Sequence, residues 1–357
     1  MEKHKIIHVL YAGLGGHANV VFPLIESDFG LNHEHVLVFF GIEDVLPAYL
    51  KRCKDLGLMH YNIKKKPRRY LKAFNQFKKI LNTIQPSRII VHSSELIIPA
   101  VNYSKKTGSK SFYVEHENNL TKGRSLNFFS RFALRHSDGV VCLNEGYKNE
   151  LIRKFKVIAP IYIIPNGINT DRFKVGRPNS ENIVLGMASR MIPGKDHRLL
   201  IGAFEQVLKK YSNLKLLIAG DGETFEEIQA LISEKKLTNS ISLLGLLNED
   251  QMIDFYRKIH LFVLATRSET LSTAILQAMS SELPVISSDI ENNIEILHSE
   301  KIGWVYKNND MDDLANKIIF AIDNRYNWGE IGQKAREDVI KKYSLLAMSN
   351  NYTRLIK

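Results

Sequence analysis

Residues 267–289 of the chain read RSETLSTAILQAMSSELPVISSD and combine an acid, a turn rich in hydroxyl groups and an apolar helix pattern. A continuous apolar run of strand length, IHLFVLA at 259–265, precedes this stretch, and a second run, LPVIS at 283–287, lies near its end. Between the two runs, apolar residues recur at helical spacing, at Ala274, Ile275, Ala278 and Met279. The order strand, turn, helix and strand predicts a βαβ unit, whose ligand crevice lies beyond the carboxyl ends of its strands.

The turn between the first of these strands and the helix, residues 266–273, is predicted to face that crevice. Its backbone N–H groups open a helix, where unpaired donors and the helix dipole favour an anionic oxygen. Glu269 lies on the rim of this turn. Because Glu269 is itself an anion, we expect it to accept hydrogen bonds from sugar hydroxyls rather than to hold a phosphate.

The order of an acid, Thr-Leu-Ser, an apolar helix, Ala-Met and Pro-Val-Ile resembles the donor site of the retaining GT-B glycosyltransferases of the group 1, family 4-like kind. The resemblance implies a nucleotide-sugar donor, no metal ion, and two glutamates with seven residues between them, of which this chain has Glu269 first and Gln277 second. In the family, the second carboxylate accepts from both ribose hydroxyls. A glutamine keeps one acceptor oxygen and replaces the other with a donor amide. If Gln277 binds ribose, one charge-assisted bond becomes neutral, which costs about 1 kcal/mol.

A pair of cations follows another predicted strand of the second half. Arg190 comes after IVLGMAS, and Lys195 stands five residues later, beyond a Pro-Gly turn. Departure of a sugar leaves negative charge on the diphosphate, and fixed cations there stabilise the transition state more than the ground state. The resemblance implies that Arg190 and Lys195 clasp the diphosphate; the alternative is a solvated pair on an exposed turn.

The resemblance assigns further residues to the donor site. Gly220 begins the Gly-Asp-Gly turn after LKLLIA, where backbone can approach a ligand; the alternative is simply a helix start. Leu246 lies in the segment LGLLN, residues 244–248, which corresponds to the loop whose backbone contacts the nucleotide base. The head of the predicted helix completes the set, with Leu271, Ser272 and Thr273. Glu282 stands where the family has a glycine that ends this helix, and a left-handed cap costs a non-glycine residue roughly 1 kcal/mol.

The chain as a whole alternates strand-like and helix-like patterns in two halves, which implies parallel sheets covered on both faces. Strands are expected at 5–12, 35–40, 88–92, 110–115 and 139–143 in the first half, and at 182–189, 214–220, 240–244, 259–265, 284–287 and 304–306 in the second. Residues 165–181, PNGINTDRFKVGRPNSE, have the composition of a linker and resemble the family's interdomain signature. We therefore expect an α/β protein with two doubly wound Rossmann-like domains facing a cleft, the GT-B arrangement. The expected parts are an acceptor-side domain at 1–165, a linker at 166–181, a nucleotide-sugar domain at 182–338 and a helical segment at 339–357 that can cross back to the first domain.

The first half carries a glycine-rich turn, GLGGHA at residues 13–18, which satisfies the dinucleotide fingerprint G-x-G-x-x-A. That fingerprint also requires an acid closing the second strand, whereas HVLVFF is followed by glycine and isoleucine. The resemblance implies instead that Gly15 and Gly16 approach the donor phosphates and the acceptor. It also implies that His116, which follows a buried strand, touches the donor sugar near its primary hydroxyl. The alternative for such a histidine is a structural role. Glu115 or Glu117 could orient this ring or touch the acceptor, and the choice stays open.

Composition and charge restrict the class of protein. The chain has 357 residues, of which 44% are hydrophobic, and a net charge of +11. No segment approaches the length of an apolar membrane span, and the first strand follows a short charged lead, so no signal peptide is expected. Cys53 and Cys142 have no second cysteine nearby, which favours buried free thiols in a reducing compartment.

Two segments hold much of the basic and aromatic character, residues 64–79 and 122–136. Such helices could rest on anionic lipid, where each basic residue contributes about 1 kcal/mol. Alternatively, their apolar residues pack on a sheet while the cations face water, and both can be true. Nucleic acid is the competing anionic partner, but no recognition motif for it is present.

A metal site has little support in the sequence. Asp310 and Asp312 have the spacing of a metal-binding acid pair, but they precede an amphipathic helix and are better explained as its cap and first-turn acids. No histidine and cysteine cluster offers a zinc site. We expect no metal and no cofactor beyond the nucleotide-sugar substrate.

These features together predict a retaining, metal-independent glycosyltransferase. It would move a hexose or N-acetylhexosamine from a nucleotide diphosphate sugar, with UDP as the expected nucleotide. The acceptor would be a saccharide or polyprenyl-diphosphate-linked saccharide in bacterial cell-surface polysaccharide or lipopolysaccharide synthesis. We expect a cytoplasmic protein, peripheral on the inner face of the plasma membrane. Two alternatives stay open: a catalytically silent GT-B subunit that binds a partner, which the glutamine at position 277 raises, and an NAD-dependent oxidoreductase.

Overall fold

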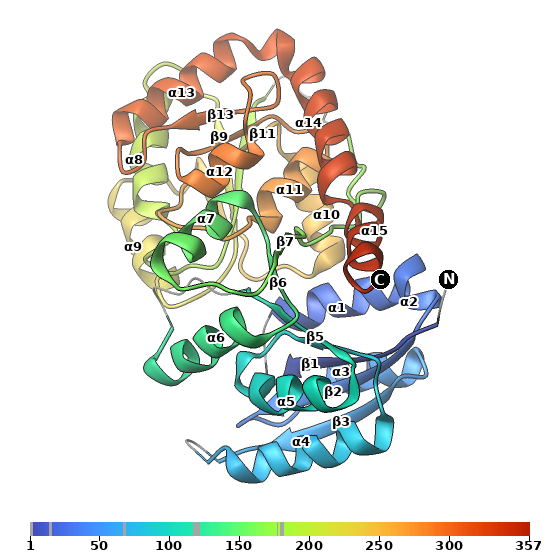
Figure 1. The fold of residues 1–357 in the computed structure, drawn as a ribbon. Coiled ribbons are helices and arrows are strands. Elements are labelled where there is room, and N and C mark those ends of the chain that lie inside the picture. The colour runs from blue at the N-terminus through green and yellow to red at the C-terminus, as the bar shows by residue number, and fades with distance from the viewer. Residues whose placement is uncertain (1–2, 14–15, 67–68, 117–121, 177, 179–181) are drawn as a thin grey trace. The chain divides into compact units, whose positions relative to one another are not determined.

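The computed structural model describes residues 3–13, 16–66, 69–116, 122–176, 178 and 182–357. Expectations for Gly15 and Glu117 therefore lie outside the described residues. The chain divides into two compact units (Figure 1). The first contains Met1–Gly167 together with Leu345–Lys357, and the second contains Ile168–Ser344. Residues 168–176, placed by sequence in the linker, thus belong to the second unit.

The first unit is built on a seven-stranded parallel sheet with the order β3-β2-β1-β4-β5-β6-β7. Its strands are β1 Lys5–Tyr11, β2 Glu34–Gly41, β3 Met59–Lys64, β4 Arg88–Val91, β5 Lys110–Val114, β6 Gly139–Cys142 and β7 Ile161–Ile163. The sequence predicted the inner five strands and missed β3 and β7, the two edges. Only one residue of β3 and none of β7 is buried, so neither edge strand shows the apolar run by which an inner strand is recognised.

Helices cover both faces of this sheet. They are α1 Gly16–Glu26, α2 Asp28–Leu31, α3 Pro47–Asp55, α4 Leu71–Ile84, η1 Ser94–Leu96, α5 Ile97–Thr107, α6 Arg124–His136, α7 Glu145–Lys154 and α15 Leu345–Leu355. One face packs against α4, α5, α6 and α7. The other packs against α1, α2 and the C-terminal helix α15, so the end of the chain returns to the first unit. Cys53 and Cys142 are buried free thiols, as predicted.

The second unit has a six-stranded parallel sheet with the order β10-β9-β8-β11-β12-β13. Its strands are β8 Val184–Ala188, β9 Lys215–Ala219, β10 Ile241–Leu243, β11 Leu261–Leu264, β12 Val285–Ser288 and β13 Trp304–Tyr306. The helices are α8 His197–Leu208, α9 Phe225–Glu234, α10 Glu249–Lys258, α11 Thr273–Ser280, α12 Glu291–Ile296, α13 Met311–Asp323, η2 Arg325–Asn327 and α14 Trp328–Tyr343. All six strands were predicted, and five of them are mostly buried, whereas β10 at the sheet edge has one buried residue.

The strand order of the second sheet reverses between β8 and β11. Chain connections run outward in opposite directions from these two neighbouring strands, so the loops that follow them leave a crevice at their carboxyl ends. This crevice is where a ligand site of the second unit is expected.

Two helix ends bear on expectations from the sequence. The cost of a non-glycine residue suggested a different turn at Glu282, but this residue, just beyond α11, has φ +60° and keeps the left-handed conformation that glycine usually supplies. Asp310 caps α13, because its Oδ1 accepts a hydrogen bond of 3.0 Å from the Asp313 N–H. In the described part of the chain, no helix has the length and apolar character needed to cross a membrane.

Candidate active site

Two loops meet at the crevice of the second sheet and are joined to one another. The loop after β8 donates from the Asp196 N–H to the carbonyl of Ala265 at 3.0 Å, and the loop after β11 returns a bond of 3.0 Å from the Arg267 N–H to Gly194. The Arg267 guanidinium also donates to the Asp196 carboxylate through two nitrogens, each at 2.8 Å. These contacts fix the positions of the two loops relative to each other.

Lys195 and Glu269 are brought together by this joining. The Lys195 ammonium forms an ion pair with the Glu269 carboxylate and lies 3.4 Å from the Thr266 hydroxyl. The two paired side chains are only 12% and 14% exposed. The Asn292 amide donates to the backbone carbonyl of Glu269 and holds that residue from the far side. Lys195 and Glu269, which were predicted from separate motifs, therefore form one partly buried ion pair.

Arg190 lies in the first of the two loops and is exposed. Within the described residues no acid pairs with its guanidinium, so its charge is available to a ligand. Arg190 and Lys195 both line the same pocket. One cation is therefore fixed by a carboxylate, and the other is free to move onto an anion.

The pocket has a volume of about 340 Å³. It is lined by all of the second-unit residues that the sequence singled out: Arg190, Lys195, Gly220, Leu246, Glu269, Leu271, Ser272, Thr273 and Gln277. Leu246, Leu247 and Met252 make part of its lining apolar, while Arg190, Lys195 and Glu269 supply the charge. A pocket of this kind suits a ligand with one flat, weakly polar part and one anionic part.

The head of α11 forms one wall of the pocket. Ser272 caps the helix, its hydroxyl accepting from the Ile275 N–H at 3.4 Å. The first N–H groups of a helix have no partner within the helix, and the helix dipole adds partial positive charge there. This wall adds donors to the charge supplied by Arg190 and Lys195.

Gln277 is anchored by a tyrosine that the sequence analysis did not identify. The Tyr256 hydroxyl donates to Gln277 Oε1 at 3.1 Å and also lies 3.2 Å from the carbonyl oxygen of Ala274. Burial raises the pKa of Tyr256, so the phenol remains a donor at neutral pH. With its oxygen held in this way, the Gln277 amide offers its N–H donors to a ligand rather than an acceptor.

Only a glycine fits at position 220, because the loop after β8 packs closely against its backbone. Its φ is +140°, and a Cβ at this position would lie 1.8 Å from the carbonyl oxygen of Ser189. The Gly220 turn therefore packs directly against the loop that carries Arg190, and it also lines the pocket. A side chain here would displace that loop.

The remaining predicted site residues belong to the first unit. Gly16 is the first residue of α1. His116 follows β5, and its Nε2 lies 2.9 Å from Nδ1 of His92 with the two rings stacked. Burial, His17 and Lys122 lower the pKa of His116 well below its usual range, so the ring is neutral near pH 7. Glu115 forms a buried ion pair with Lys122.

Sequence reasoning missed the residues that position the site, namely Asp196, Arg267, Asn292 and Tyr256. A signal was present for the first two. Asp196 directly follows Lys195, and Arg267 is the first residue of the segment 267–289. The two residues have opposite charges and lie on two loops that each follow a predicted strand, so an ion pair between the loops could have been considered. Asn292 and Tyr256 lie on other elements, and nothing in their local sequence points to this pocket. Among the described residues, no cluster of three or more histidine, cysteine or acidic side chains is arranged to hold a metal ion.

Comparison with known proteins agrees with this architecture. The family described as "Glycosyl transferases group 1" matches residues 168–342, and "Glycosyltransferase Family 4" matches residues 14–172. A poly(ribitol-phosphate) alpha-N-acetylglucosaminyltransferase of Staphylococcus aureus is 27% identical over 249 residues, which are 68% of this chain and 49% of that protein. The chain thus spans about half the length of this relative.

Two solved structures share the fold over essentially the full chain. A glycosyltransferase of Rickettsia africae has a TM-score of 0.85 at 20% identity, covering 100% of this chain and 98% of that one. The Anabaena protein HepE, solved in complex with UDP, has a TM-score of 0.83 at 14% identity, with 99% of each chain covered. Since the two family patterns together extend over residues 14–342, this chain belongs to the group 1 glycosyltransferases and has the GT-B fold.

Proposed function

We propose that the protein is a retaining, metal-independent glycosyltransferase that uses a UDP-sugar. The observation that carries this proposal is the pocket in the second unit, in which two cations lie beside an apolar wall. The apolar part, with Leu246 and Leu247, suits the base, and Arg190 and Lys195 suit the diphosphate. The HepE structure, which contains UDP, supports the choice of nucleotide.

The chemistry assigned to these residues is charge stabilisation. As the bond between sugar and phosphate breaks, negative charge grows on the diphosphate, and Arg190, Lys195 and the head of α11 lower its energy without a metal. Glu269, which already holds Lys195, accepts hydrogen bonds from sugar hydroxyls. The acceptor hydroxyl attacks on the face that the diphosphate leaves, and a diphosphate oxygen takes its proton. His116, neutral at pH 7, orients the sugar through its primary hydroxyl.

The sugar, acceptor and location are proposed on chemical and comparative grounds. The S. aureus relative is named for transfer of N-acetylglucosamine to poly(ribitol-phosphate), which supports an N-acetylhexosamine or hexose here. We propose a saccharide or polyprenyl-diphosphate-linked saccharide of the bacterial cell surface as acceptor. A lipid-linked acceptor lies in the membrane, so we propose that the protein acts at the inner face of the plasma membrane. Its excess of basic residues suits the anionic lipid there.

Thermal unfolding with UDP, GDP, ADP and NAD tests the proposal. A ligand at 100 times its dissociation constant adds roughly 2.7 kcal/mol to the free energy of unfolding, so UDP is expected to raise the melting temperature and NAD is not. A response to NAD alone would favour the oxidoreductase. No response to any nucleotide would favour a silent partner subunit, which the glutamine at position 277 also suggests. A donor screen with membrane extract as acceptor then identifies the sugar.

Replacing Gln277 by glutamate is expected to tighten UDP binding about fivefold, or ~1 kcal/mol, because a charged acceptor for ribose hydroxyls returns. Calorimetric titration with UDP measures the change. Gln229→Glu, an exposed position on α9 of the same unit, adds the same charge outside the pocket and is the control. Equal affinities in the wild type and Gln277→Glu would show that this side chain does not face ribose.

A further inference from the structure

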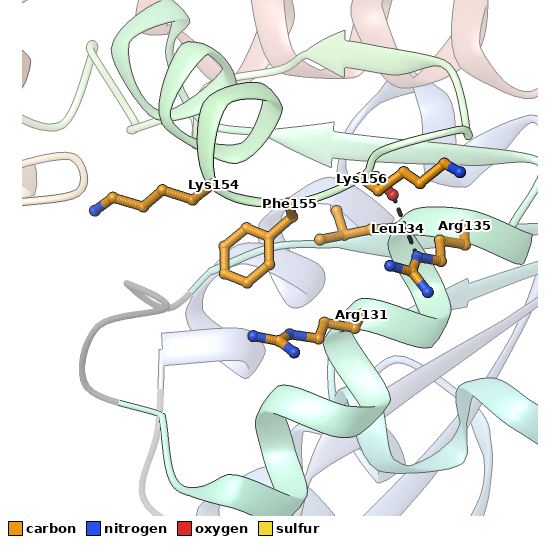
Figure 2. Close-up of a pocket in the computed structure, with 6 residues that line it drawn as sticks. All are labelled: Arg131, Leu134, Arg135, Lys154, Phe155 and Lys156. Atoms are coloured by element: carbon orange, nitrogen blue, oxygen red, sulfur yellow. Dashed lines mark hydrogen bonds between the residues drawn. The ribbon is translucent and has the colours of Figure 1, made fainter.

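A second pocket lies in the first unit, between α6 and the segment that follows α7. It has a volume of about 140 Å³ and is lined by Arg131, Leu134, Arg135, Lys154, Phe155 and Lys156. Figure 2 shows the two arginines extending from α6, Phe155 and Leu134 between the charged groups, and the two lysines directed to either side. Four of the six lining residues are cations, and none is an acid.

Each of the two exposed guanidinium groups makes one contact inside the pocket. Arg131 lies over the ring of Phe155, with its Cζ 5.4 Å from the ring centroid. Arg135 donates from Nε to the carbonyl of Lys156 at 3.4 Å, which leaves its two terminal nitrogens for other partners. Leu134 anchors the floor, because its carbonyl accepts from the N–H groups of Ile158 and Ala159 at 3.0 and 3.1 Å.

The charge of this pocket is largely uncompensated. Lys154 pairs with Glu150 at 2.8 Å. Within the described ranges, no acid pairs with Arg131, Arg135 or Lys156. Two neighbouring guanidinium groups without counter-charge suit a phosphate, which they can bind through paired hydrogen bonds. The volume is several times the roughly 30 Å³ of one water molecule, so a phosphate-sized group fits.

Exposed apolar side chains stand close to this pocket in sequence. Phe128 on α6 is 60% exposed and one helical turn before Arg131, Ile152 on α7 is 54% exposed, and Ile158 beyond Lys156 is 64% exposed. Apolar side chains beside cations are the pattern of a surface that inserts into the headgroup region of a bilayer. A membrane lipid would contact these apolar side chains as well as the cations, whereas a soluble phosphate would contact the cations alone.

The other basic helix is less suited to this role. Before α4, Lys64 pairs with Asp44 at 2.7 Å, and Lys65 pairs with Glu95 at 2.8 Å. Part of the positive charge of that segment is therefore used within the protein. We propose that the pocket between α6 and the segment that follows α7 binds the phosphate group of an anionic membrane lipid. This surface would then be the part of the protein that contacts the membrane. This inference deepens the proposed function, on which the membrane location rests.

Cosedimentation of the full chain with vesicles tests the proposal. Vesicles of equal parts phosphatidylcholine and phosphatidylglycerol are compared with phosphatidylcholine alone, for the wild type, Arg131→Gln/Arg135→Gln and the control Lys78→Gln/Lys79→Gln. The control removes two exposed charges from α4. The pocket variant is expected to bind anionic vesicles at least about tenfold more weakly and the control almost as well as the wild type. Phe128→Gln is expected to weaken binding without any change in charge. Equal losses in the two double variants, or equal binding to both kinds of vesicle, would overturn the proposal.

A second arm distinguishes a lipid from a soluble phosphate. Inorganic phosphate is titrated against the protein while the arginine Nε–Hε signals are followed by NMR. Loss of a phosphate response in the pocket variant, with vesicle binding intact, would assign the pocket to a soluble phosphate and overturn its assignment to lipid. The UDP-induced rise in melting temperature is measured on the same samples. If that rise persists in all variants, a negative vesicle result would reject lipid binding by the pocket but would leave the proposed transferase function intact.

Discussion

Replacing Lys195 by alanine is expected to lower turnover at least about tenfold, which corresponds to roughly 1.4 kcal/mol on the barrier. The lysine is one of two cations assigned to the departing diphosphate, and a charge acting in a partly buried position is worth more than one in water. Its removal also leaves Glu269, its ion-pair partner, as an uncompensated anion beside the diphosphate. Both effects raise the energy of the transition state.

Steady-state kinetics with the donor found in the screen measure this effect as kcat and kcat/KM. Lys209→Ala, at an exposed position at the end of α8, is the matched control and should keep wild-type kinetics. The melting temperature of each variant separates loss of catalysis from loss of fold. Unchanged kcat and kcat/KM in Lys195→Ala would remove this side chain from the mechanism.

Acidification from pH 6.5 to 5 is expected to destabilise the first unit steeply. A row of histidines crosses its sheet, with one ring from each of four neighbouring strands or strand ends and one from α1. The members are His35, His8, His92, His116 and His17. Successive ring centroids along the row are 5.2, 5.8, 5.2 and 4.8 Å apart.

Burial lowers the pKa of each of these histidines, to about 4 for His17 and His35. The folded protein therefore binds no proton on them at a pH where the unfolded chain, with a histidine pKa near 6.5, already does. Their neutral form stabilises the fold fully above that pKa, and the contribution is lost as the pH falls below it. Each such group reduces the free energy of unfolding by about 1.4 kcal/mol per pH unit in this window.

Urea unfolding at a series of pH values measures the slope. A loss of several kcal/mol between pH 6.5 and 5 is expected from several groups acting together. His17→Gln should reduce the slope by about 1.4 kcal/mol per pH unit, while His60→Gln, exposed on β3, should leave it unchanged. A free energy of unfolding that stays level or increases over this range would contradict the account. Most carboxylates titrate below this window, so histidines dominate it.

The sequence predicted the second unit better than the first for a physical reason. Its site residues follow buried strands with strong apolar runs, and the loops after parallel strands gather at one edge of a sheet. Arg190, Lys195 and Glu269 could therefore be expected at one edge of the sheet, and the resemblance to the family assigned them, together with Gln277 on the following helix, to one donor site. The Asp310 cap of α13 could also be predicted, because the start of a helix is a local feature.

Features that depend on strand order or on distant partners were not predictable from this sequence. The histidine row is formed by residues far apart in the chain, and only the order β2-β1-β4-β5 brings His35, His8, His92 and His116 side by side. Edge strands β3 and β7 lack the burial that produces an apolar pattern. Tyr256 reaches Gln277 from α10, a packing contact with no counterpart in local sequence.

The proposed mechanism requires that two cations of the second unit, Arg190 and Lys195, take the place of a metal ion at the departing diphosphate. A crystal structure of the protein soaked with UDP in metal-free buffer tests this mechanism. We expect the diphosphate within hydrogen-bond distance of both Arg190 and Lys195, with the base against Leu246 and Leu247. A diphosphate bound away from these two side chains, or held only when a divalent ion is added, would contradict it.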